Sequence, residues 1–148
     1  MSRKAGSGSA GKKTQTTRLP KIQTLAKEIS LKLKGGEILA LIGPLGSGKT
    51  TFTRHLGKAL KIRRLITSPT FTIMHSFPFG SVKEGKNKPF TLYHLDLYRT
   101  KNFKEVGQLG ITEVWGKKNT LTVIEWADKI AKHLPKKAYK IYFEAPVK

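Results

Sequence analysis

ILALI-GPLGSGKT-TFTRHLGKAL, residues 38–60, is the stretch that decides the fold. A short apolar run next to glycines predicts a buried strand over Glu37–Ile42. Gly43–Thr50 matches the phosphate-loop pattern G-x-x-x-x-G-K-[ST]. From about Gly48 to Leu60, large apolar residues recur every four positions, which predicts an amphipathic helix. A strand, a glycine-rich loop and a helix in this order are the context in which the pattern indicates nucleotide binding.

Each residue type in this loop has a chemical purpose. Gly46 and Gly48 allow the backbone to wrap closely and to point successive N–H groups at phosphate oxygens. The helix that follows adds the positive end of its dipole. Lys49 is predicted to reach the β- and γ-phosphates, and the hydroxyl of Thr50 to reach Mg²⁺. Pro44 lacks a backbone donor, but it precedes the N–H groups expected to hold phosphate, so we expect it to be tolerated.

The composition is that of one soluble domain with an unusual charge. The chain has 148 residues, 38% of them apolar, and no cysteine, which excludes disulfides and thiolate chemistry. Residues 1–13 are Gly-, Ser- and Lys-rich and are predicted to be a flexible basic tail, and 14–148 a single P-loop ATPase domain. The longest apolar run, Ile38–Ile42, is too short for a membrane span, and no signal peptide is evident, so we expect a cytoplasmic protein.

The net charge of +20 comes from 29 basic residues against nine acids, the first of which is Glu28. Such a balance attracts polyanions through counterion release. A lysine-rich surface that only maintains solubility is the alternative. Lys outnumbers Arg 23 to 6, and Arg is the better reader of bases. Loose contact with an RNA-containing partner is therefore favoured over sequence-specific reading.

Outside the central stretch, apolar periodicity continues to alternate between strands and helices. An apolar stripe begins at Ile22 after Pro20, and Gly35-Gly36 ends the helix that carries it. Predicted strands cover Thr14–Leu19, Thr72–Phe79, Phe90–Tyr98, Leu121–Glu125 and Ala138–Phe143, and further helices cover Asn102–Trp115 and Ala127–His133. Strands alternating with helices predict an α/β layered sheet.

Two acids follow apolar runs, where solvation alone would not place them. Glu125 ends the predicted strand Leu121–Glu125, the position in which P-loop enzymes hold Mg²⁺ or its waters. Asp96 shares a strand face with His94, which is expected to orient it. The alternatives are a surface ion pair for Asp96 and a helix N-terminal carboxylate for Glu125. The hydroxyl-rich bend at Thr67–Thr72 is either a simple turn or a switch segment sensing the γ-phosphate.

These segments, taken in order, resemble the TsaE (YjeE) family of bacterial ATPases. The motifs that carry the resemblance, across nearly all of the chain from about Thr14, are Gly43–Thr51, Ser68-Pro69-Thr70-Phe71, His94-Leu95-Asp96-Leu97-Tyr98-Arg99, Leu109-Gly110-Ile111 and Ile124-Glu125-Trp126. The phosphate loop is shared by many proteins, whereas the S-P-T-[FY] and H-x-D-L-Y-R segments at this spacing are specific. Two positions depart from the family pattern: Pro44 stands where Asp or Glu is usual, and Ala127 where Pro is usual.

The resemblance implies a P-loop NTPase-like three-layer sandwich with a mainly parallel central sheet. It also implies Mg²⁺-dependent ATP hydrolysis that supports the TsaD–TsaB complex in forming N6-threonylcarbamoyladenosine at position 37 of tRNA, with the RNA contacted indirectly and no membrane involved. The implied catalytic residues are Lys49, Asp96, Glu125 and the switch Thr70, and the implied metal residues are Thr50, Glu125 and Asp96. The implied nucleotide-binding residues are Leu45, Gly46, Ser47, Gly48, Lys49, Thr50, Thr51 and Trp126.

No arginine is placed by the sequence as a catalytic finger, since only Arg99 sits near a motif. Weak ATPase activity that a partner raises is therefore expected. A small-molecule kinase is an alternative, but the six arginines form no cluster of the kind a kinase lid carries. A small GTPase is disfavoured because no N-K-x-D segment is present. The alternative from another class is an RNA-binding module whose nucleotide site is only structural.

Overall fold

The computed structural model describes residues 14–64, 66–67, 74–80, 90–108 and 110–145. A six-stranded sheet forms its centre, in the order β1-β6-β2-β5-β4-β3. All neighbouring strands pair in parallel except β3, which pairs antiparallel with β4 at one edge. The strands are β1 (Thr14–Thr17), β2 (Glu37–Ile42), β3 (Met74–Phe79), β4 (Phe90–Asp96), β5 (Thr120–Glu125) and β6 (Tyr139–Phe143). The helices are η2 (Leu19–Lys21), α1 (Ile22–Lys32), α2 (Lys49–Ala59), α3 (Phe103–Gly107), η3 (Ile111–Glu113) and η4 (Ala127–His133), where η marks 3₁₀ turns.

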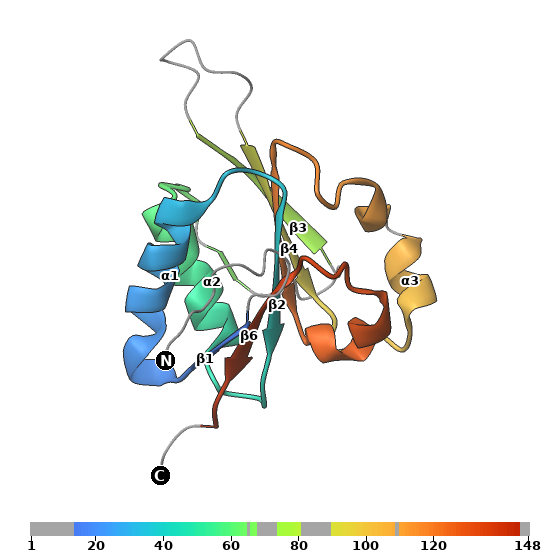
Figure 1. Ribbon diagram of the computed structural model, residues 1–148, viewed down its shortest axis with the longest axis horizontal. Helices are drawn as coiled ribbons and strands as arrows, with labels where there is room; N and C mark the ends of the chain where they lie inside the picture. Colours follow the sequence, from blue (N-terminus) through green and yellow to red (C-terminus); the bar gives the residue numbers. More distant parts are fainter. Residues whose placement is uncertain (1–13, 65, 68–73, 81–89, 109, 146–148) are drawn as a thin grey trace.

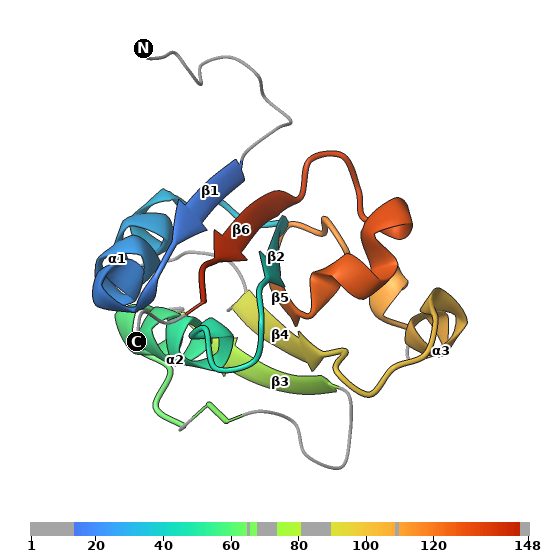
Figure 2. The ribbon, with the colours of Figure 1, turned by 90° about the horizontal axis from the view of Figure 1, so that it is seen from below.

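Helices cover both faces of the sheet, which makes three layers. Figures 1 and 2 show α1 and α2 side by side on one face, and α3 with the turns of η4 on the other. Each face has its own apolar cluster, one built around Phe52 and Leu56 of α2 and the other around Ile124, Val106 and Ile130. The predicted α/β sandwich with a mainly parallel sheet is confirmed.

The burial of the central strands explains why the candidate site lies where it does. All six residues of β5 are buried, because helices cover both of its faces. In β2 and β5, Leu41 pairs in register with Glu125, and Asp96 at the end of β4 pairs with the same Glu125. The carboxyl ends of β2, β4 and β5 therefore meet at one edge, the usual ligand position in open α/β sheets.

Some predicted boundaries shift. The strand predicted to reach Tyr98 ends at Asp96, so the alternation along β4 does not extend to Tyr98. The predicted helix over Ala127–His133 is present as 3₁₀ turns, with a kink at Ile130, whose φ is −123°. It follows Trp126, a non-glycine residue with a left-handed backbone (φ 61°). None of the helices in the described ranges combines the length and apolarity that a bilayer crossing requires.

Candidate functional site

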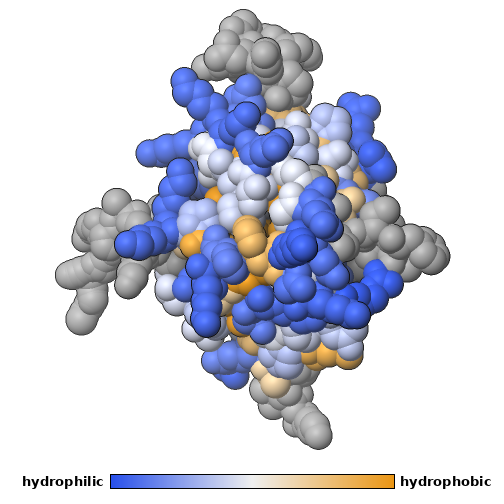
Figure 3. Space-filling view, turned by 90° about the vertical axis from the view of Figure 1, so that its right-hand side faces the viewer, coloured by the Kyte–Doolittle hydropathy of each residue, from blue (hydrophilic) through white to orange (hydrophobic). Residues whose placement is uncertain are grey.

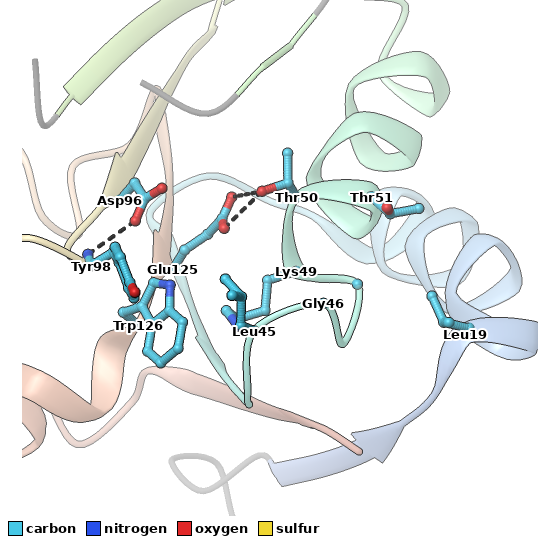
Figure 4. A pocket seen from close by; sticks show the side chains of 11 residues that line it. Leu19, Leu45, Gly46, Lys49, Thr50, Thr51, Asp96, Tyr98, Glu125 and Trp126 are labelled. Carbon is cyan, nitrogen blue, oxygen red and sulfur yellow. Dashed lines mark hydrogen bonds between the residues drawn. The ribbon is translucent and has the colours of Figure 1, made fainter. Parts of the chain in front are cut away.

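A cavity of about 260 Å³ opens beside the phosphate loop, Gly43–Thr50, at the carboxyl edge of the sheet. Figure 4 shows side chains from the loop, from the ends of β4 and β5 and from the segment before α1 converging on it. Its lining residues are Leu19, Leu45, Gly46, Gly48, Lys49, Thr50, Thr51, Asp96, Tyr98, Glu125 and Trp126. Three of the sequence motifs, Gly43–Thr51, the H-x-D-L-Y-R segment and Ile124-Glu125-Trp126, thus meet around one hollow.

The glycines of the loop are required by its backbone. Gly46 (φ 79°) and Gly48 (φ 110°) both have left-handed conformations that side chains disfavour. A Cβ at Gly46 would meet no atom within 4 Å, whereas one at Gly48 would lie 2.3 Å from Ile22 Cδ1. Gly48 therefore lets α1 pack against the loop, and Gly46 leaves the backbone of the loop open. Helix α2 begins at the next residue, Lys49, with its N-terminus at the cavity.

Lys49 is buried, although it carries a charge. Its Nζ donates to Gly43 O at 2.6 Å and to Pro44 O at 2.9 Å, and lies 4.1 Å from the centre of the Trp126 ring. Two carbonyl acceptors and an aromatic face hold the ammonium group on the cavity wall. The two carbonyls belong to the loop itself and the ring to the residue after β5, so the protein holds the lysine in position.

Burial lowers the pKa of Lys49 below its ordinary value of 10.5, because the charged form loses its water. Glu125, Asp128 and Asp96 oppose this shift through their negative charge. Burial is the larger of the two effects. An anionic ligand in the cavity would favour the charged lysine in the same way as these acids.

Glu125 is the centre of a buried polar cluster. Its side chain accepts from Thr50 Oγ1, which lies 2.9 Å from both carboxylate oxygens, and its Oε2 lies 2.7 Å from His94 Nε2. Glu125 is 2% exposed and His94 is fully buried. Such a carboxylate next to a hydroxyl is an oxygen donor set of the kind Mg²⁺ prefers.

Asp96 supplies a second carboxylate to the same wall. It ends β4 beside Glu125 and lines the cavity, and its Oδ1 accepts from the backbone N of Tyr98 at 3.0 Å. Among the described residues, no three His, Cys, Asp or Glu side chains form a metal cage. The residues nevertheless fit Mg²⁺, which proteins usually bind through one or two carboxylates together with substrate phosphates.

The expected pairing of His94 with Asp96 is replaced by a different one. Strand alternation does place the two residues on one face of β4, but the imidazole reaches across to Glu125 on β5. The other ring nitrogen, Nδ1, is buried without a partner among the described residues. His94 therefore orients Glu125, the carboxylate that Thr50 also contacts. Of the other histidines, His133 packs flat on Phe103, with ring centres 4.0 Å apart.

Three residues of the site were missed by sequence reasoning. Leu19 reaches the cavity from the turn before α1, and nothing in its local sequence points there. Tyr98 packs on Trp126 with ring centres 5.1 Å apart, and its place in the H-L-D-L-Y-R segment was an available signal. Asp128 acts on Lys49 through its charge, and its closeness in sequence to Glu125 could have suggested it.

Most of the predicted binding residues line the cavity. Leu45, Thr51 and Trp126 do so together with the residues described above. Ser47 differs, because its side chain is fully buried, does not line the cavity, and has an Oγ without a partner among the described residues. Thr70 and its neighbours in the S-P-T-F segment lie outside the described residues, as do Leu109 and the tail 1–13.

No arginine of the described ranges lines the cavity. Arg54 points away from it, since its Nε donates to Ile66 O at 3.0 Å. Arg64 lies over the ring of Phe77, 5.0 Å from its centre. The only side-chain cation on the cavity wall within this part of the chain is Lys49.

Comparison with known proteins gives a consistent result. A sequence model described as "Threonylcarbamoyl adenosine biosynthesis protein TsaE" matches residues 16–147. The tRNA threonylcarbamoyladenosine biosynthesis protein TsaE of Bacillus subtilis is 35% identical over 129 residues, which cover 87% of this chain and 75% of that protein. The protein of the same name from Aquifex aeolicus is 44% identical over 81 residues, 53% of this chain and 55% of that protein. A crystal structure of YdiB from Bacillus subtilis superposes with a TM-score of 0.64 and 29% identity, covering 87% of this chain and 73% of that one.

Proposed function

This chain belongs to the TsaE family of tRNA threonylcarbamoyladenosine biosynthesis proteins, and from that premise we propose that it is a Mg²⁺-dependent ATPase. In this proposal ATP binds in the cavity beside the phosphate loop and is hydrolysed slowly. The TsaD–TsaB pair raises the rate and uses the cycle to form threonylcarbamoyladenosine on tRNA in the cytoplasm.

One observation carries the proposal: a lysine and a Thr–Glu pair share the wall of one cavity. Lys49 Nζ and the Thr50–Glu125 pair line the same 260 Å³ hollow. Lys49 is held by two loop carbonyls, and a phosphate oxygen is a stronger acceptor for an ammonium group than a neutral carbonyl. The N-terminus of α2 adds its dipole at the same point. The arrangement favours a polyphosphate over a neutral ligand.

The acids divide into two roles in this mechanism. Thr50 and Glu125 would hold Mg²⁺, because their oxygens lie within 2.9 Å of each other and His94 fixes the carboxylate. Asp96 lies beside them on the cavity wall and orients the attacking water. Bound Mg²⁺ neutralises charge that develops on the transferring phosphoryl group. Water then attacks the γ-phosphorus in line, and the β,γ-bridging oxygen leaves with ADP.

The absence of an arginine from the described cavity wall accounts for the expected slow turnover. P-loop enzymes without an arginine finger turn over on the order of 10⁻⁴ to 10⁻³ s⁻¹ when unassisted. A partner protein that supplies such a group, or that orders the site, would raise the rate by several orders of magnitude. The kinase alternative would need the arginines of a phosphoryl-transfer lid at this wall, and none of the described arginines lies there.

The test is a titration with ATP·Mg²⁺ that follows tryptophan fluorescence and phosphate release, with and without the TsaD–TsaB pair. The Trp126 ring lies 4.1 Å from Lys49 Nζ, so binding should change its emission. Trp126→Phe should remove the change and Trp115→Phe, the matched control, should retain it. Calorimetry that shows no binding at millimolar ATP would refute the proposal. Turnover above about 1 s⁻¹ for the isolated chain would refute the dependence on a partner.

A further inference from the structure

A second cationic cluster lies along the C-terminal half of α2 and the segment that follows it. A hollow of about 140 Å³ there is lined by Arg54, Lys58, Arg63 and Arg64, together with Gly57, Ile62 and Ile66. Four of the seven lining residues are cationic and none is acidic. Of the lining residues on α2, Arg54 lies five residues after Lys49, and Gly57 and Lys58 lie roughly 12 to 14 Å along the helix axis from it. The cluster is therefore not part of the candidate nucleotide site.

Protein contacts hold two of these cations in place. Arg54 Nε donates to Ile66 O at 3.0 Å, and the guanidinium of Arg64 lies 5.0 Å from the centre of the Phe77 ring. Arg63 and Lys58 are exposed beside them. Because a carbonyl and a ring already restrain Arg54 and Arg64, these side chains lose less freedom when an anion binds, which lowers the entropy cost of binding.

Within the residues that the structure describes, no carboxylate forms a salt bridge with these cations. The sequence contains no acid between Glu37 and Glu84. The one acid on α1 or α2, Glu28, acts electrostatically on Tyr139 of β6. Cations gathered without acids repel one another, and a bound anion relieves that repulsion.

The charge continues over the neighbouring helix. A second hollow of about 290 Å³ lies between α1 and α2 and shares Lys58 with the first. Lys27 of α1 and His55 of α2 also line it. Two adjoining hollows with a shared lysine fit a string of phosphates better than a single phosphate group.

We propose that this surface binds the phosphodiester backbone of RNA directly. We call it the α1–α2 basic face, and it consists of Lys27, Arg54, Lys58, Arg63 and Arg64. The choice of RNA among polyanions rests on the proposed role in tRNA modification. Contacts to phosphates position a protein on RNA without reading its sequence. The face therefore holds tRNA while the cavity at the other end of α2 turns over its nucleotide.

The test measures binding of a fluorescein-labelled, unmodified tRNA transcript by anisotropy over a range of salt concentrations. The variant carries Lys58→Gln, Arg63→Gln and Arg64→Gln. The matched control carries Lys104→Gln, Lys132→Gln and Lys136→Gln, which removes the same charge from exposed positions of α3, of η4 and of the segment after η4. Helix α3 and the turns of η4 cover the opposite face of the sheet from α1 and α2. Figure 3 views that face, where hydrophilic side chains are also abundant, so the control tests location against total charge.

The α1–α2 variant is expected to bind tRNA about tenfold or more weakly than the wild type, with the slope of log K against log salt reduced by about 2 to 3. The control should lose less than about threefold. Equal losses in the two variants, or unchanged binding in the first, would overturn the proposal. So would tighter binding to vesicles of anionic phospholipid than to the transcript.

Failure of this proposal is distinguishable from failure of the proposed ATPase. The α1–α2 variant should retain the wild-type affinity for ATP·Mg²⁺, which also shows that it is folded. Loss of tRNA binding with intact ATP binding supports the RNA-binding face. A wild-type chain that binds ATP·Mg²⁺ but not the transcript refutes the face alone, and one that binds the transcript but not ATP refutes the ATPase alone.

Discussion

The two ends of helix α2 carry cations in opposite settings. At the N-terminal end Lys49 is buried, held by two carbonyls and an aromatic ring, and influenced by three acids. Along the C-terminal half, a hollow is lined by Arg54 and Lys58 and by the arginines that follow the helix, and none of these has an acidic partner within the described residues. The first setting suits one ligand in one geometry. The second suits a polyanion that many cations contact loosely.

This difference matters because burial and exposure change what a charge can do. A buried ammonium group interacts strongly with whatever anion reaches it, since little water screens the interaction. Exposed cations are screened over about 10 Å at ordinary ionic strength, so their binding depends on salt and on number. We therefore expect substitutions near Lys49 to change ATP binding alone, and substitutions in the α1–α2 basic face to change tRNA binding alone.

Lys49→Ala should have the largest effect. It removes the only side-chain cation on the described cavity wall, and two charge-assisted hydrogen bonds to phosphate are worth about 3 to 6 kcal/mol, so ATP affinity should fall by about 1,000-fold. Calorimetry measures this. Lys58→Ala, on the same helix, is the matched control and should bind ATP like the wild type. If both variants showed the same reduced ATP affinity, the two ends would not be separable.

Glu125→Gln should have the next largest effect and should act on turnover more than on binding. The amide keeps the shape of the carboxylate between Thr50 and His94 but removes its negative charge. Loss of one preorganised electrostatic group commonly costs about 100-fold in turnover. Phosphate release in the presence of the TsaD–TsaB pair measures it. Asp96→Asn serves for comparison, and wild-type turnover in the Glu125 variant would remove that residue from the mechanism.

Lys27→Gln should have a smaller effect, confined to tRNA binding by the α1–α2 basic face. Because the substitution removes a single ammonium group from the basic face, it should weaken tRNA binding about fivefold and lower the salt slope by about 0.9. Anisotropy with the labelled transcript measures both quantities. ATP affinity should not change. An unchanged salt slope would place Lys27 outside the α1–α2 basic face.

The smallest expected effect is on the pH dependence of stability, which should reveal that the charge of Lys49 is buried. The folded state lowers the pKa of Lys49, so between that lowered pKa and 10.5 the unfolded chain binds more protons than the folded one. The free energy of unfolding contributed by this group therefore rises with pH in that window.

Urea denaturation of the wild type and of Lys49→Met measures this contribution as a difference. The difference in the free energy of unfolding should shift in favour of the wild type as pH approaches 10.5. The raised pKa of Tyr139 acts in the opposite direction, but it is present in both proteins and cancels. A difference that does not vary with pH would contradict the burial of the Lys49 charge.

Local patterns predicted most of the fold because strand, loop and helix follow directly from residue spacing. The run before Gly43 and the four-residue stripe of α2 each depend on neighbours in sequence. The meeting of Asp96 and Glu125 also followed, since the carboxyl ends of parallel strands reach one edge of a sheet. The 3₁₀ form of η4 did not, because an apolar spacing does not distinguish an α-helix from 3₁₀ turns that break at Ile130.

The side-chain contacts within the site could be predicted less well from the sequence. Alternation along β4 places His94 and Asp96 on one face, but it does not say which neighbouring strand the imidazole will reach. The structure places Glu125 2.7 Å from it. Leu19 reaches the cavity because α1 packs against Gly48, a contact between segments distant in sequence. The role predicted for Thr70 stays a prediction.

By itself, the sequence determined the phosphate loop, the alternation of strands and helices, and the excess of positive charge, because each is a property of spacing or composition. Only the tertiary structure decided that His94 serves Glu125 and that Lys49 is buried beneath Trp126. It alone also gathered Arg54, Lys58, Arg63 and Arg64 around one hollow. The physical reason is that burial and electrostatic partnership depend on distances across the chain, which folding fixes and which no local pattern encodes.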